Sequence, residues 1–77
     1  MLEISSIHVY GVPLPIGGGR YAIRTKQGLI PVQCDVPRDR EQLQTSAGRS
    51  KRVLVLGDLA TIEGELVVYC HSVWFRP

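Results

Sequence analysis

Several features that identify particular protein classes are missing from this 77-residue chain. Its apolar runs, such as residues 53–56, are far shorter than the roughly 20 residues that span a bilayer. No basic segment precedes an apolar one at Met1-Leu2-Glu3, which predicts no signal peptide, a cytoplasmic location and no membrane partner. Aromatic residues make up only 6% of the chain, so a dense row of stacking platforms is excluded.

Catalytic and metal-binding patterns are also absent. The chain has no G-x-S-x-G, and its glycine run at residues 17–19 lacks the spacing of a phosphate-binding loop. His8 and His71 have no adjacent nucleophile or acid, and Cys34 and Cys70 do not follow a metal-ligand spacing. Both cysteines lie in apolar stretches, as buried free thiols do, and a disulfide between them would require a secretory context. We therefore expect no enzyme, no cofactor and no metal.

The charges that are present are unevenly distributed. The formal net charge is only +2, but residues 20–26 carry Arg20, Arg24 and Lys26 without any acid. Residues 38–52 carry five basic residues against two acidic ones, whereas residues 53–77 are net negative. If the two basic segments share a face, the molecule is polarised and that face attracts polyanions.

Alternating apolar and polar residues predict a chain made mainly of β-strands, at residues 4–14, 20–26, 29–34, 51–60 and 65–75. The clearest alternation is in the second strand. It places one set of side chains on one side, Arg20, Ala22, Arg24 and Lys26, and the other set on the opposite side, Tyr21, Ile23 and Thr25. Gly11 and Pro13 predict a bend in the first strand, Pro31 an unpaired or edge stretch, and Gly57 a sharp curl. Residues 15–19 are expected to form a flexible loop.

One segment departs from this pattern. Residues 38–44 are good helix formers with no β-branched residue, and they predict either a two-turn helix ended at residues 46–48 or a polar loop. Leu43 is its only apolar residue. The whole chain, residues 1–77, is accordingly expected to form one all-β domain with a short helix or loop between strands three and four.

A closed barrel is the arrangement that hides both the strand edges and the apolar face of such a small sheet. The segments 7–11, 21–32, 53–59 and 64–69 follow one another as a strand ending in glycine, a strand-turn-strand and a V-x-G-x-L…G-x-L-x-V closing hairpin. This succession resembles the oligonucleotide/oligosaccharide-binding (OB) fold over nearly the whole chain. Among OB domains it resembles those of single-strand-binding proteins, without matching one specific family. An SH3-like barrel is the main alternative.

The resemblance implies a binding surface on strands two and three, flanked by the loops at residues 15–19 and 60–65. Exposed cations would follow the phosphates of single-stranded DNA or RNA, with Tyr10 and Trp74 available for stacking. Since Trp74 and Phe75 are adjacent, alternation predicts that one of them is buried. The candidate nucleic-acid-binding residues are Arg20, Arg24, Lys26, Tyr10, His8, Gln33, Arg52 and Trp74. The alternative function is a protein-interaction or assembly subunit, whose apolar barrel surface mediates homo-oligomerisation or docking on a protein partner.

Overall fold

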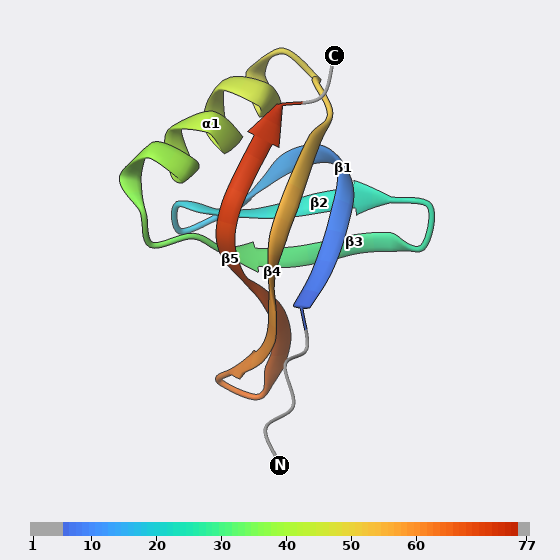
Figure 1. Ribbon diagram of the computed structural model, residues 1–77, viewed down its shortest axis with the longest axis vertical. Coiled ribbons are helices and arrows are strands. Elements are labelled where there is room, and N and C mark those ends of the chain that lie inside the picture. The colour runs from blue at the N-terminus through green and yellow to red at the C-terminus, as the bar shows by residue number, and fades with distance from the viewer. Residues whose placement is uncertain (1–5, 76–77) are drawn as a thin grey trace.

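Five strands close into a small barrel. The computed structural model describes residues 6–75, which form β1 (Ser6–Gly17), β2 (Arg20–Thr25), β3 (Gly28–Gln33), α1 (Pro37–Gly48), β4 (Val53–Ile62) and β5 (Glu65–Phe75). The strands follow the order β1-β2-β3-β5-β4, and β4 pairs back onto β1 (Figure 1). Only the β3–β5 pairing is parallel among these strands. The predicted all-β barrel is confirmed, and it is compatible with an OB-like fold; residues 4–5 of the predicted first strand lie outside the described residues.

β1 serves two neighbours because it bends at Gly11. Residues up to Gly11 pair with β4, and those from Val12 onward pair with β2. A Cβ atom on Gly11 would lie 2.9 Å from the carbonyl carbon of Arg24 and 3.0 Å from Cγ2 of Ile23. Glycine is therefore the residue that lets β1 come close enough to β2 to change partners. The bend predicted from the sequence occurs here.

Gly57 has the same role in β4. The register between β4 and β5 shifts between Leu56 and Gly57, and a Cβ on Gly57 would lie 2.9 Å from Val68 Cγ1. Beyond this bulge the β4–β5 hairpin projects from one end of the barrel, whereas α1 lies at the other end (Figure 1). The predicted curl at Gly57 is confirmed.

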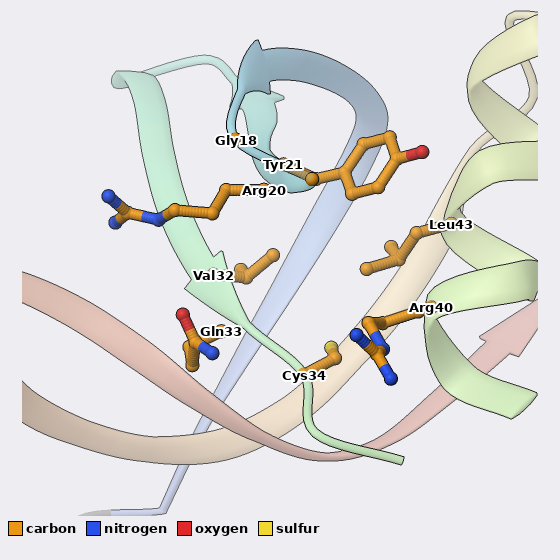
Figure 2. A pocket seen from close by; sticks show the side chains of 9 residues that line it. Gly18, Arg20, Tyr21, Val32, Gln33, Cys34, Arg40 and Leu43 are labelled. Atoms are coloured by element: carbon orange, nitrogen blue, oxygen red, sulfur yellow. The ribbon is translucent and has the colours of Figure 1, made fainter. Parts of the chain in front are cut away.

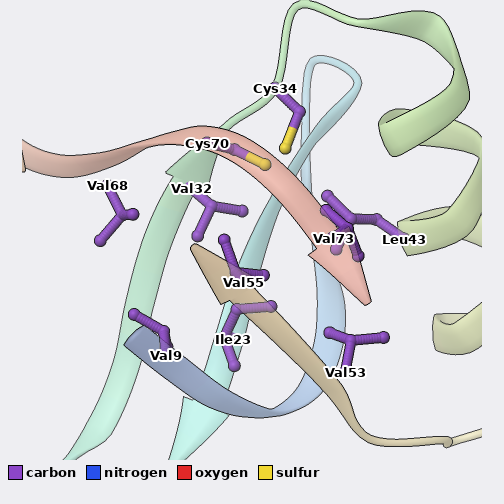
Figure 3. Packing of buried hydrophobic residues seen from close by; sticks show 10 residues of the cluster. All are labelled: Val9, Ile23, Val32, Cys34, Leu43, Val53, Val55, Val68, Cys70 and Val73. Carbon is purple, nitrogen blue, oxygen red and sulfur yellow. The ribbon is translucent and has the colours of Figure 1, made fainter. Parts of the chain in front are cut away.

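Valine dominates the barrel interior. The buried cluster contains Val9, Ile23, Val32, Cys34, Leu43, Val53, Val55, Val68, Cys70 and Val73 (Figure 3). The expectation that either Trp74 or Phe75 is buried was wrong, since they are 58% and 53% exposed. Trp74 points outward by alternation, and Phe75 is the last residue of β5, so no further residue of that strand covers it.

Two connecting segments differ from their predicted limits. α1 extends through Gly48, a full turn beyond residue 44, and it buries Asp39, Leu43 and Ser46 at a spacing that puts them on one face. Leu43, 1% exposed, therefore packs against the core although the helix has no apolar stripe. Between β1 and β2, the predicted loop at residues 15–19 is reduced to Gly18 and Gly19, because β1 continues to Gly17.

Candidate functional site

Tyr10 lies at one end of an outward-facing row that crosses three strands. Its neighbour Val9 points into the core, so the Tyr10 ring points outward and is 45% exposed. Tyr10 is paired with Leu54 on β4, and Leu54 is paired with Trp74 on β5. The indole Nε1 of Trp74 donates a hydrogen bond to Ser72 Oγ at 3.1 Å, which restrains the ring. The outer surface of β1, β4 and β5 therefore presents two aromatic rings separated by one leucine.

Cations flank this aromatic row. The guanidinium carbon of Arg52 lies 6.0 Å from the centroid of the Tyr10 ring, a distance at which cation–π attraction operates. Lys26 lines an open hollow of about 280 Å³ together with His8 and Tyr10. Three of the predicted binding residues, His8, Lys26 and Arg52, thus lie near the exposed ring of a fourth, Tyr10.

The turn between β2 and β3 holds Lys26 in this position. Thr25 Oγ1 accepts a hydrogen bond from the Gln27 backbone N–H at 3.1 Å and donates one to the Gly28 carbonyl at 2.9 Å. Gly28 adopts a positive φ of 116°, which a residue with a Cβ rarely does. Because the turn is closed by its own side chain, Lys26 is presented from a defined loop next to β1.

Arg24 completes the surface. It is exposed and is paired across the sheet with Val12 of β1. Val12 lies two residues after Tyr10 on the same strand. Within residues 6–75 the ion pair that the structure contains is His71–Asp58, so no carboxylate of that part of the chain neutralises Arg24, Lys26 or Arg52. We call this surface the Tyr10 face; it consists of Tyr10, Arg24, Lys26, Arg52, Leu54 and Trp74.

Arg20 and Gln33 lie apart from the Tyr10 face. They line a separate hollow of about 120 Å³ with Arg40 of α1 and Cys34, below the β1–β2 turn (Figure 2). Arg20 is half-buried, and its Nε is a buried atom without a hydrogen-bond partner. The predicted row of Arg20, Arg24 and Lys26 therefore runs from the α1 end of β2 to the β2–β3 turn, with its two ends in different hollows.

Asp35 organises the surface beside that second hollow. Its carboxylate accepts hydrogen bonds from the Tyr69 hydroxyl and from Gln33 Nε2, the latter at 3.2 Å. The bond from Tyr69 is the main reason that the pKa of Asp35 lies below its usual value, and the same bond raises the pKa of Tyr69. Gln33, a predicted binding residue, is thus already engaged within the protein.

Sequence reasoning did not single out Leu54 or Arg40. Leu54 joins the two aromatic rings only through the β1–β4 and β4–β5 registers, and alternation within one strand carries no information on register. Arg40 was visible as part of a basic segment, but its proximity to Arg20 depends on how α1 packs against the barrel.

Residues 6–75 meet neither the requirements of a metal site nor those of a membrane-spanning helix. No cluster of three or more His, Cys, Asp or Glu side chains there is placed to hold a metal ion. In the same residues, no helix combines the length and apolar character that crossing a bilayer demands. Comparison of the chain with family models, with curated proteins and with solved structures gives no match.

Proposed function

We propose that this protein is an OB-like module that binds single-stranded nucleic acid through the Tyr10 face. The observation that carries the proposal is the exposed Tyr10 ring, with Arg52 6.0 Å from its centroid and Lys26 beside it in one hollow. Non-specific single-strand binders combine these two elements, an aromatic platform for a base and cations for the adjacent phosphates.

The charge distribution supports the same ligand. Arg24, Lys26 and Arg52 are exposed and unpaired with carboxylates of residues 6–75, so their fields extend into solvent. Glu63 and Glu65 lie on the β4–β5 hairpin, which projects from the barrel on the other side of the Gly57 bulge. A polyanion is therefore attracted to the Tyr10 face and not to that hairpin.

The experiment is a titration with a fluorescently labelled oligonucleotide of about 16 nucleotides, the upper end of the site size of one OB fold. Binding should weaken steeply between about 50 and 200 mM salt, with a log–log slope of about −0.7 for each phosphate contacted on a single strand. Three cations on the face predict a slope of about −2. Trp74 is the only tryptophan of the chain, so quenching of its fluorescence reports directly on stacking at this face.

Single substitutions distinguish binding through the Tyr10 face from attraction to any basic part of the protein. Tyr10→Ala should weaken binding by about 1–3 kcal/mol, the usual contribution of one stacked base, whereas Tyr10→Phe should retain most of the affinity. Lys26→Gln should reduce the salt slope by about 0.7. Arg38→Gln removes an exposed cation of α1 and is the matched control, for which no change is expected. Absence of salt-sensitive binding at micromolar protein, or equal losses in Arg38→Gln and Lys26→Gln, would overturn the proposal.

The β4–β5 hairpin supports a second candidate function, protein interaction or self-assembly. Leu59, Ile62 and Leu66 on this projecting hairpin are 45%, 36% and 61% exposed. A two-stranded ribbon with uncovered leucines gains stability when a partner covers it. Light scattering after size exclusion tests this function: a stable oligomer that Leu66→Glu dissociates supports it, and a monomer up to high protein concentration excludes self-assembly.

A further inference from the structure

Cys34 and Cys70 both come directly after the shortest strand pairing in the described barrel, one on each chain segment of the pair. The β3–β5 ladder has only two register pairs, Val32 with Val68 and Gln33 with Tyr69. The next residue on each strand is a cysteine, and both are free thiols. Each cysteine is 6% exposed, and Figure 3 shows the two sulfur atoms turned toward one another inside the barrel.

We propose that Cys34 and Cys70 are a modification site, at which a low-molecular-weight disulfide such as oxidised glutathione converts the pair into a reversible cross-link between β3 and β5. One protein thiolate attacks the S–S bond of the reagent, forms a mixed disulfide and expels one small thiol. The second protein sulfur then attacks the mixed disulfide and expels the other small thiol. The protein loses two protons and two electrons, which is two hydrogen atoms in all, and the reagent takes them up and leaves as two thiols.

The backbone geometry suits this bond. Neighbouring strands are about 4.8 Å apart, which lies within the roughly 4.4–6.8 Å that separate the Cα atoms of disulfide-bonded cysteines. Both side chains point to the same side of the sheet, since both belong to the buried core. Closing the bond therefore requires side-chain rotation and not a rearrangement of the barrel.

The reagent reaches the pair through the second hollow. Cys34 lines that hollow together with Gly18, Gly19 and Arg40, so one of the two sulfurs adjoins solvent-filled space (Figure 2). A hydrogen bond with Cys70 and burial raise the pKa of Cys34, and the same hydrogen bond lowers the pKa of Cys70. Cys70 is accordingly the thiol that ionises first, and the Cys34 S–H, which keeps its proton, donates a hydrogen bond to the Cys70 sulfur.

The test begins with the reduced, full-length protein incubated in glutathione buffers of increasing oxidised fraction. Free thiols are then trapped with an alkylating reagent and the protein is digested with trypsin. The expected product is one cross-linked peptide pair joining residues 27–38 to residues 53–77, from a chain that has lost two hydrogen atoms and has not dimerised. The oxidised protein should unfold at higher urea, with a folded-to-unfolded ratio raised on the order of a hundredfold or more.

Single cysteine variants distinguish the cross-link from simple attachment of glutathione to one thiol. Cys34→Ala and Cys70→Ala each leave one thiol, so each should stop at the mixed disulfide with glutathione, and circular dichroism checks that they fold. Cross-linking only between chains, or only in denaturant, would overturn the proposal. So would an intramolecular disulfide that leaves the urea midpoint unchanged, because a native cross-link of this length stabilises the fold.

Discussion

Replacing Gly11 by alanine tests the strand bend that positions the Tyr10 face. The added Cβ would overlap the Arg24 carbonyl group, with the carbonyl carbon at 2.9 Å, and would also meet Ile23 Cγ2 at 3.0 Å. Backbone cannot move aside as a flexible side chain does, so the cost should reach the upper end of the overpacking range, about 3 kcal/mol. A domain of this size has a total stability of about 4–12 kcal/mol, so Gly11→Ala removes a large fraction of it.

The corresponding fall in Tm is about 12–24 °C, which circular dichroism during heating measures directly. Urea unfolding at 25 °C gives the free energy independently. Gly48→Ala is the matched control, because a Cβ on Gly48 meets no atom within 4 Å at the end of α1. This control should be neutral or stabilising by up to about 1 kcal/mol, since alanine is the better helix former. A Gly11→Ala protein within about 0.5 kcal/mol of the original, below the usual overpacking cost, would refute the close approach of β1 and β2.

Two further predictions concern the surface around the second hollow. Asp35→Asn removes the carboxylate that raises the pKa of Tyr69, so the Tyr69 pKa should return toward 10.0 in an absorbance titration with Tyr69→Phe as reference; an unchanged titration would contradict the bond. In the original protein this bond strengthens folding above the unfolded-state pKa of Asp35 and is lost as the pH falls through the lowered folded-state pKa. It is also lost as the pH rises through the raised folded-state pKa of Tyr69. Arg40→Gln should slow cross-linking by anionic glutathione disulfide on the order of three- to tenfold, and leave the rate with uncharged hydroxyethyl disulfide unchanged. Equal rates of Arg40→Gln and the original protein with glutathione disulfide would show that Arg40 does not guide the reagent to the cysteine pair.

Alternation within each strand predicted most of the side chains that point outward, but not Ala22, which it placed beside the cations of β2 and which is 2% exposed. The polar face of β2 and the outward ring of Tyr10 follow from a two-residue period, and the glycines at 11 and 57 indicated where strands bend. Alternation failed for Phe75, because exposure at a strand end depends on what lies beyond it. Helix propensity missed the last turn of α1, where burial of Ser46 against the barrel outweighs the weak helix propensity of serine.

The composition of the Tyr10 face was less predictable than its individual members. Three cross-strand register pairs bring its members together: Tyr10 with Leu54, Leu54 with Trp74, and Arg24 with Val12, which lies two residues from Tyr10. A shift of one residue in any ladder would move these side chains to the opposite side of the sheet. The basic segments at residues 20–26 and 38–52 do meet, but at two places, because Arg52 joins the Tyr10 end and Arg40 joins the Arg20 end.

The two proposed activities depend on different parts of the barrel. The Tyr10 face rests on the outer surface of the β1–β4 and β4–β5 ladders, which have the most register pairs and hold Tyr10 and Trp74 in place before a ligand arrives. Such preorganisation lowers the entropy lost on binding. The cysteines lie inside the barrel at the β3–β5 ladder, where the fewest backbone pairs hold the strands together. A cross-link there constrains the weakest closure of the fold without entering the Tyr10 face, so oxidation should act on the lifetime of the folded barrel and not on the chemistry of its binding surface.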